Sequence, residues 1–300
     1  MGMKYLIFPG QGSQKPGFLE PWLVNDVFRR QIKSHSEITG LDLVHLGTKA
    51  SQEEISQTSI TQPLIVSASI ASVRTVFGDD GISRFDAMAG HSVGEFAAAA
   101  IAGVITDDEA MSLVGQRAQA MQMAAEQTET GMVAAIGSDI EKLQSKLGGL
   151  QIANYNGANQ YVLAGTKGEL AEIQDSPPEG FRIIPLSVSG AFHTPHMESA
   201  RIQLEQLFNQ VVAKDPVVNL LSNRDGRPVS SGTEYVRALL SQVSSPVRWD
   251  MCMQEMNDAS IVVEAAPSGV LTNLVKKTIP TAHTYSLKTA DQSIDLADHD

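Results

Sequence analysis

Short apolar runs alternate with longer segments of helical spacing along the first part of the chain. The run "MKYLIF" at 3–8 predicts a buried strand that leads into a glycine turn. "PLIVSASIASVRTVF" at 63–77 has the length of a helix and begins with proline at a favoured first helical position. "FDAMAG" at 85–90 predicts a second strand, followed by a helix at 93–102. The segment 106–127 opens with a Thr-x-x-Glu capping box and predicts a further helix.

The pattern changes between about residues 128 and 190, where shorter elements follow one another closely. The expected order is strand, helix, strand, strand, helix and strand, at 131–137, 138–147, 150–156, 160–166, 167–174 and 181–188. This β-α-β-β-α-β order is that of a ferredoxin-like unit. Because longer helices flank it, we expect 128–190 to be a small subdomain inserted in a larger domain.

After residue 190 the chain returns to strands alternating with longer helices. We expect helices at 196–212, 232–241, 247–257 and 268–277, and strands at 217–221, 260–264 and 282–287. Such alternation favours an α/β fold with a mainly parallel sheet covered by helices. The expected large domain is therefore discontinuous, 1–127 and 191–288, and the polar tail 289–300 is expected to be disordered.

Composition narrows the class of protein. The 300 residues carry a net charge of −12, which argues against binding of nucleic acid but permits a local cationic pocket. No apolar run approaches the roughly 18 residues of a membrane span, and the N-terminus lacks the layout of a signal peptide. Cys252 is the single cysteine, so no intrachain disulfide is possible and a cytoplasmic location is expected. We also expect a monomer that requires no cofactor.

The first candidate for chemistry is Ser92, in the pentapeptide Gly90-His91-Ser92-Val93-Gly94. A serine between glycines, after a strand and before a helix, fits the G-x-S-x-G nucleophile elbow. The glycines let neighbouring backbone approach closely, and the helix N-terminus offers N–H groups to a developing oxyanion. The alternative is a serine that only caps the helix, and the pentapeptide alone leaves both open.

A nucleophilic serine needs a base, and His193 is the favoured candidate. It lies where the small subdomain returns to the large one and where a cleft is expected. His91 adjoins Ser92, and adjacent side chains on such a turn diverge. A loop histidine with only local hydrogen bonds is the alternative for His193. A metal site formed with His196 is rejected, because Pro195 separates the two and no third His or Cys is close in sequence.

Arg117 is the most informative charge. It lies on the apolar stripe of its helix, four residues after Leu113 and four before Met121. A guanidinium on a buried face is costly unless an anion meets it. An internal Asp or Glu is one such anion, and a substrate carboxylate held by the planar guanidinium is the other.

The glycines of "FPGQGSQ" at 8–14 also follow a predicted strand. The dinucleotide fingerprint fails because Lys15 stands where a third glycine is required. The P-loop pattern fails because Phe18 follows Gly17 where lysine is required. The segment instead predicts a backbone turn whose N–H groups point into a site.

Several segments together resemble the malonyl-CoA:acyl carrier protein transacylase family over nearly the whole chain. They are "FPGQGSQ" (8–14), "TQPLI" (61–65), "GHSVGE" (90–95), "QRAQAMQ" (116–122), "ANYNGANQYVLAG" (153–165), "GAFHTPHM" (190–197) and "QVSSPVRW" (242–249). The resemblance implies an α/β-hydrolase-like large domain with a ferredoxin-like insert. It also implies ping-pong transfer of malonyl from malonyl-CoA to the phosphopantetheine thiol of acyl carrier protein, for fatty acid or polyketide synthesis.

The resemblance further implies roles for individual residues. Ser92 would carry the malonyl ester, and His193 would be its general base. The backbone N–H groups of Gln11 and Val93 would form the oxyanion hole. The main-chain carbonyl of Gln242 would orient His193 in place of an acidic triad member.

On the substrate side, the resemblance implies that Arg117 binds the malonyl carboxylate. Phe192 would narrow the space where an α-methyl branch would lie. The other residues expected to line the site are Gln62, His91, Asn154 and Asn156.

The chain departs from the family pattern where Ala118, Ala266 and Ser268 stand at positions that often hold glycine. None of these departures removes a reacting group, so altered loop geometry is expected and activity is retained. Two other functions stay open at this point. One is an esterase or thioesterase with the same Ser–His pair, and the other is a catalytically silent protein that docks a carrier.

Overall fold

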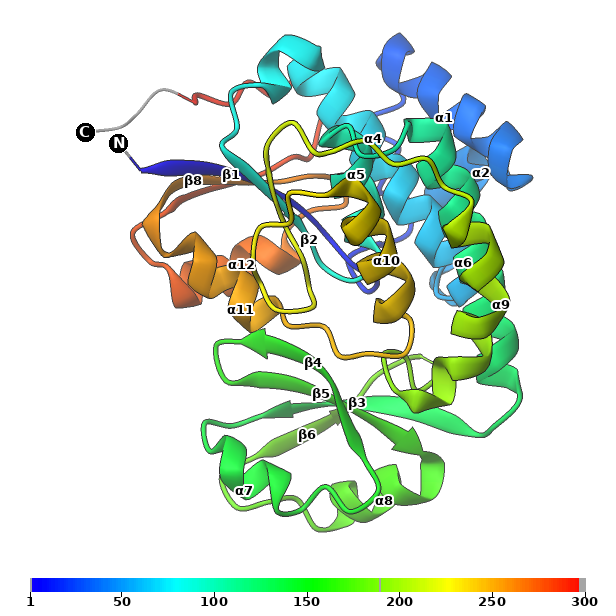
Figure 1. The fold of residues 1–300 in the computed structure, drawn as a ribbon, viewed down its shortest axis with the longest axis vertical. Helices are drawn as coiled ribbons and strands as arrows, with labels where there is room; N and C mark the ends of the chain where they lie inside the picture. Colours follow the sequence, from blue (N-terminus) through cyan, green and yellow to red (C-terminus); the bar gives the residue numbers. More distant parts are fainter. Residues whose placement is uncertain (1, 189, 297–300) are drawn as a thin grey trace.

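The computed structural model describes residues 2–188 and 190–296, and its strands form two sheets (Figure 1). The larger sheet is parallel throughout, in the order β7-β2-β1-β8-β9. Its strands are β1 Met3–Phe8, β2 Ala87–Gly90, β7 Asn219–Leu221, β8 Ala259–Glu264 and β9 His283–Ser286. The prediction of an α/β fold with a mainly parallel sheet is confirmed.

Helices cover both faces of the larger sheet. Along β1, Leu6 and Phe8 pack on one face, and Tyr5 and Ile7 pack on the other. The first face is covered mainly by α1 Asp26–Thr39, α4 Thr58–Ile82, α5 Gly94–Ile101, α6 Asp107–Glu126, α9 Glu198–Asn209 and α10 Gly232–Gln242. The second face is covered by α11 Trp249–Glu255 and α12 Val270–Thr278. A strand buried on both sides is the expected state of a parallel sheet.

The helix expected at 63–77 begins earlier than predicted. It starts at Thr58, so Pro63 lies inside α4 and not at its first position. A proline this near the start of a helix removes a single backbone hydrogen bond, and the nearby Thr61 side chain ties the start of α4 to the end of α3 by donating to Ile55 O. Gly78, with φ of 59°, interrupts α4 near its end.

Two features of this region were absent from the predictions. The short helices α2 Leu43–Thr48 and α3 Gln52–Ile55, together with α1, connect β1 to α4. Among the described residues, α4 is the helix long and apolar enough to cross a membrane by length and composition, although the sequence predicted no membrane span. Of the most apolar window of α4, 72% is buried inside the protein, as is typical of a core helix.

The smaller sheet is antiparallel, in the order β4-β5-β3-β6. Its elements are β3 Thr130–Ile136, α7 Ile140–Gln144, β4 Gln151–Gly157, β5 Gln160–Thr166, α8 Lys167–Asp175 and β6 Arg182–Pro185. Leu143 of α7 and Leu170 of α8 pack on the sheet around Leu163. The chain order is the predicted β-α-β-β-α-β of a ferredoxin-like unit.

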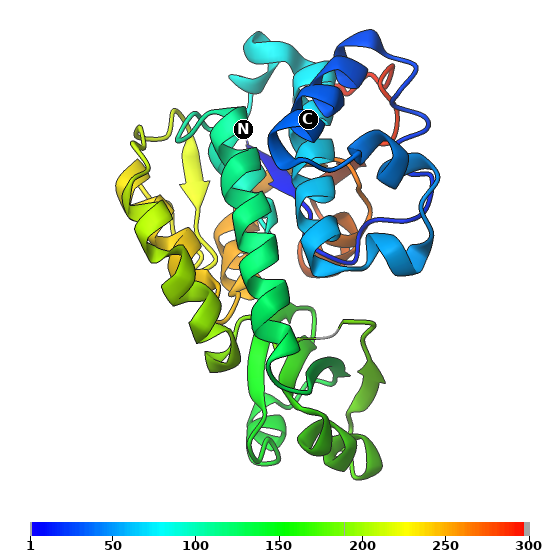
Figure 2. The ribbon, with the colours of Figure 1, turned by 90° about the vertical axis from the view of Figure 1, so that its right-hand side faces the viewer.

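The two sheets are joined where β4 meets the C-terminal half of the chain. Val247 N–H donates to Ala153 O, and Tyr155 N–H donates to Val247 O, each at 2.9 Å. Figure 2 shows α6 leading from the larger part down to the smaller sheet. The two hydrogen bonds of Val247 hold β4 against the larger part. The domain boundaries themselves, 1–127 with 191–288 and 128–190, stay a prediction.

The expectation of a disordered tail at 289–300 is wrong for residues 289–296. Leu296 is 1% exposed within the core of the larger part, and Ala290 and Ile294 pack against the same core. These apolar side chains give an otherwise polar segment enough contact to dock. Residues 297–300 lie outside the described residues.

Candidate active site

Ser92 lies on a sharp turn between β2 and α5. Its φ is +52°, a left-handed conformation that side chains other than glycine rarely adopt. A Cβ on Gly90 would lie 2.1 Å from Glu95 N, and one on Gly94 would lie 2.3 Å from Phe8 O. Both glycines are therefore required by backbone contact, as the elbow geometry predicts. Ser92 does not make the side-chain cap of α5 that the alternative required.

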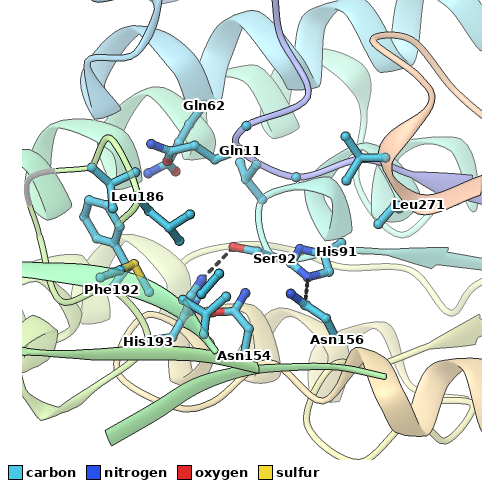
Figure 3. Close-up of a pocket in the computed structure, with 18 of the residues that line it drawn as sticks. Gln11, Gln62, His91, Ser92, Asn154, Asn156, Leu186, Phe192, His193 and Leu271 are labelled. Atoms are coloured by element: carbon cyan, nitrogen blue, oxygen red, sulfur yellow. Dashed lines mark hydrogen bonds between the residues drawn. The ribbon is translucent and has the colours of Figure 1, made fainter. Parts of the chain in front are cut away.

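His193 meets Ser92 across the site, from a segment about a hundred residues later. Ser92 Oγ lies 2.7 Å from His193 Nε2, and His193 Nδ1 lies 2.8 Å from Gln242 O (Figure 3). A carbonyl oxygen can only accept, so Nδ1 carries the ring proton of the neutral imidazole. Nε2 is then free to accept the proton of the Ser92 hydroxyl, which is the geometry of a general base.

Burial sets the protonation state of the two histidines beside Ser92. Burial, the charge of Arg117 and the nearby His91 lower the pKa of His193 to about 3. Burial also lowers the pKa of His91, whose Nε2 lies 2.9 Å from Asn156 Oδ1. His91 therefore faces Asn156 and leaves the serine to His193, and both rings are neutral at pH 7.

Arg117 is 1% exposed on α6, as the apolar stripe predicted. Nη1 donates to Gln62 Oε1, and Nη2 donates to Gln242 Oε1 at 3.0 Å. Among the described residues no carboxylate forms an ion pair with Arg117, and its Nε–H has no acceptor. Burial lowers the pKa of Arg117 to about 10, which leaves it charged at neutral pH. The internal acid considered from the sequence is thus not its hydrogen-bonding partner.

These groups line one cavity of about 310 Å³. Every predicted site residue lines this cavity except Gln242, which lies behind His193. The other side chains of its wall are mostly apolar and include Met121, Met132, Val162, Leu186, Val188, Leu271 and Leu274. Figure 3 shows Ser92 at the centre, with Gln11 above it and Phe192 and His193 to one side. A polar centre with apolar walls is typical of a small-molecule site.

Two backbone N–H groups are candidates for stabilising a negative oxygen. Gln11 follows the end of β1, and Val93 precedes the first residue of α5. Both residues line the cavity. Within residues 2–188 and 190–296, neither N–H donates to a protein acceptor. They meet the requirement for oxyanion donors in that they are not already engaged.

The smaller sheet contributes one wall through β4. Asn154 and Asn156 both project into the cavity from this strand (Figure 3). Asn154 is 8% exposed, and its Oδ1 has no hydrogen-bond partner among the described residues. A buried amide oxygen without a donor is costly, so this atom is suited to accept a hydrogen bond from a bound molecule.

Two buried polar residues beneath Ser92, Asn223 and Glu95, were not among the predicted site residues. Asn223 Oδ1 accepts from Ser92 N–H at 2.7 Å, and Asn223 Nδ2 donates to Gly90 O at 2.7 Å. Glu95, which is 1% exposed, accepts from Asn223 N–H at 2.7 Å. Asn223 thereby holds both sides of the strained turn. A polar residue just after the strand predicted at 217–221, and a lone acid in the apolar helix after Ser92, were the available signals.

The described residues offer no ready metal site. Between residues 2–188 and 190–296, no group of three or more His, Cys, Asp or Glu side chains is arranged to hold a metal ion. The chemistry that the geometry supports is nucleophilic catalysis by a serine and a histidine.

The comparisons with known proteins agree with this geometry. The sequence matches the family described as acyl transferase domain over residues 5–291. A malonyl CoA-acyl carrier protein transacylase of Mycobacterium bovis is 40% identical over 277 residues, which are 91% of this chain and 92% of that protein. The crystal structure of MCAT from Mycobacterium tuberculosis has a TM-score of 0.89 and 38% identity, covering 96% of this chain and 98% of that chain.

A further solved structure is similar. It is described as a type II PKS acyl-carrier protein in complex with its malonyl-transacylase. Its TM-score is 0.88 at 28% identity, and the match covers 96% of this chain and 96% of that chain.

Proposed function

Because the chain belongs to the malonyl CoA-acyl carrier protein transacylase family of acyl transferases, we propose that it transfers malonyl from malonyl-CoA to the phosphopantetheine thiol of an acyl carrier protein. One observation carries the proposal. The hydrogen-bonded pair of Ser92 and His193 shares a cavity with Arg117, a buried cation that has no ion-pair partner among the described residues.

The first half-reaction forms the acyl-enzyme. His193 Nε2 takes the proton of Ser92 as Oγ attacks the thioester carbonyl of malonyl-CoA. The negative oxygen of the tetrahedral intermediate accepts from the N–H groups of Gln11 and Val93. The C–S bond then breaks, and His193 returns the proton to the departing CoA sulfur. Malonyl remains as an ester on Ser92.

The second half-reaction repeats these steps with the carrier. The phosphopantetheine thiol gives its proton to His193 as its sulfur attacks the malonyl ester. The C–O bond breaks, and Ser92 Oγ takes the proton back from His193. In both halves the carbonyl of Gln242 keeps the imidazole oriented, a role that the 2.8 Å contact supports.

Arg117 fixes the orientation of the malonyl group. Two of its N–H groups are engaged by Gln62 and Gln242, and the others are available to a carboxylate. Holding the far end of a short acyl group places its carbonyl next to Ser92, which is an orientation effect. Phe192, buried in the same wall, limits the room for an α-methyl branch.

The proposal extends to the setting of the enzyme. We propose that the enzyme acts as a monomer. The single buried thiol of Cys252 supports a cytoplasmic location.

Replacing Arg117 with alanine tests the assignment of substrate. We expect kcat/KM for malonyl-CoA to fall by about 100-fold or more, because charge-assisted hydrogen bonds to the carboxylate are lost. Acylation by acetyl-CoA, whose acyl group carries no carboxylate, should change little. Products are separated by mass into malonyl-carrier and free malonate. Unchanged use of malonyl-CoA would refute the carboxylate role of Arg117, and free malonate as the main product of the wild type would identify a thioesterase.

A further inference from the structure

The contacts of Arg117 raise the question of what keeps it oriented. Its two protein acceptors are amide oxygens, Gln62 Oε1 and Gln242 Oε1. An amide presents an acceptor at one end and a donor at the other. Only the oxygen end can face a guanidinium, so the position of Arg117 depends on which way each amide is turned.

The amide of Gln242 is turned by its surroundings. Its Nε2 donates to Glu95 Oε2 and has two further acceptors nearby, Asn223 Oδ1 at 3.2 Å and Ser92 O at 3.4 Å. With acceptors on that side, Oε1 is left to face Arg117. Gln62 is held less firmly, since within the described part of the chain its Nε2 meets only the sulfur of Met121, at 3.6 Å.

Glu95 contacts both Gln242 and Asn223. Its Oε2 accepts from Gln242, and its Oε1 accepts from the backbone N–H of Asn223 at 2.7 Å. A carboxyl group keeps an acceptor lone pair on both oxygens, whereas an amide accepts at one end only. Burial raises the pKa of Glu95 to about 8, and the hydrogen bond from Asn223 and the charge of Arg117 act in the opposite direction.

We propose that Glu95 is a positioning residue for recognition of the acyl carboxylate. It fixes the Gln242 amide, and that amide holds Arg117 with its remaining N–H groups toward the cavity. Glu95 itself does not line the cavity. The inference rests on the proposed function, because it requires that Arg117 binds the carboxylate of the substrate.

The isosteric change Glu95→Gln tests whether the orientation of Arg117 depends on Glu95. The backbone N–H of Asn223 claims the amide oxygen of the new glutamine, which leaves an NH₂ group facing Gln242 Nε2. Two donors then face each other, and their repulsion displaces the Gln242 amide, so that its Oε1 no longer holds Arg117 in place. The guanidinium loses an acceptor and its orientation, while the Ser92–His193 pair and the backbone carbonyl of Gln242 are not altered.

The experiment compares acylation of Ser92 by malonyl-CoA and by acetyl-CoA in single-turnover reactions followed by intact mass. For Glu95→Gln we expect the malonyl rate at subsaturating substrate to fall about 10-fold to 100-fold, the range of one hydrogen bond to a charged group. The acetyl rate should stay within about twofold, so the malonyl-to-acetyl ratio falls. An unchanged ratio, or equal loss with both substrates, overturns the proposal and indicates a merely structural role.

Two further variants make the outcome decisive. Glu264→Gln replaces another fully buried glutamate that accepts from backbone N–H groups, at the start of α12, and it should leave the ratio unchanged. Arg117→Ala separates the two hypotheses. If it lowers the ratio and Glu95→Gln does not, the proposed function stands and the role of Glu95 fails. If Arg117→Ala leaves the ratio unchanged, the carboxylate role of Arg117 fails and the positioning role fails with it.

Discussion

Among the described residues, two buried Ser–His hydrogen bonds have similar lengths, and one of these pairs lines the cavity of the candidate site. Ser92 Oγ lies 2.7 Å from a ring nitrogen of His193, and Ser67 Oγ lies 2.9 Å from a ring nitrogen of His35. Ser67 is fully buried and His35 is 3% exposed. Proximity of the two side chains is therefore not what distinguishes a nucleophile.

The backbone beneath the two pairs differs. Ser92 and His193 both have positive φ, +52° and +61°, on turns that lead out of regular structure. Ser67 and His35 lie inside α4 and α1, where the pair joins two packed helices. Strained turns raise the side chains into the cavity, whereas helix faces turn them into the core. The pair that we propose to react is thus the one whose backbone holds it open to the cavity.

The imidazoles also differ in how they are held. In His193 the ring binds the serine through Nε2, and Nδ1 is engaged by a carbonyl that fixes the tautomer. In His35 the ring binds the serine through Nδ1. A general base needs a fixed tautomer and a reacting group within reach, and His193 has both.

Removal of each serine is the strongest way to break the comparison. Ser92→Ala should abolish the malonyl ester and lower turnover by about 10⁴-fold or more, as for other serine nucleophiles. Ser67→Ala removes an equally short hydrogen bond in the core and should leave turnover within about twofold. Carrier malonylation and intact mass measure both. A Ser92→Ala protein that still forms a malonyl ester would place the nucleophile elsewhere.

The pH dependence of acylation sharpens the comparison next. A histidine base with the ordinary pKa near 6.5 would lose roughly 20-fold of its neutral form between pH 7 and pH 5. Burial and the charge of Arg117 lower the pKa of His193 to about 3, so it remains neutral over this range. We therefore expect kcat/KM for acylation of Ser92 to change by less than about twofold.

Stopped-flow or quenched acylation with malonyl-CoA at constant ionic strength tests this expectation. His91 faces the same site, and burial lowers its pKa too, so it gains a proton less readily on acidification than an ordinary histidine. A bell-shaped or stepwise change in kcat/KM centred near pH 6.5 would show that the imidazole of His193 is exposed to solvent. The structural account of its environment would then be wrong.

Local patterns were enough to predict the elbow and the buried arginine. The glycines within two residues of Ser92 indicate the elbow. The apolar stripe of its own helix indicates that Arg117 is buried. The pairing of His193 with the carbonyl of Gln242 is a contact between distant segments, and only the resemblance to a family implied it. Asn223 and Glu95 were not predicted, because the burial of a single polar residue depends on neighbours that are distant in the sequence.

The errors in the fold have related causes. The start of α4 was placed at Pro63 by local preference, but the side chains of Thr61 and Gln62 are buried and the helix begins at Thr58. The tail was expected to be disordered from its polarity, yet Leu296 docks in the core. In each case tertiary burial outweighed a local signal.

The smallest expected effect concerns the buried pair of Ser67 and His35. Burial lowers the pKa of His35, so the unfolded state binds more protons than the folded state below the ordinary pKa near 6.5. Its contribution to stability is therefore complete above that pH and is lost as the pH falls, at up to about 1.4 kcal/mol per pH unit. His35→Asn keeps an amide for Ser67 and removes this titration.

Urea unfolding at pH 7 and pH 5 measures the difference. His35→Asn should be about 1–2 kcal/mol less stable than wild type at pH 7, because the smaller side chain leaves a cavity in the core. The gap should narrow at pH 5, since wild type alone continues to lose stability at this position. The exposed His45→Asn is the control and should follow wild type at both pH values. Turnover at pH 7 should stay within about twofold for both variants. Parallel stability curves for His35→Asn and wild type would show that His35 titrates in the folded protein as it does in the unfolded chain, and that its hydrogen bond to Ser67 does not keep it neutral.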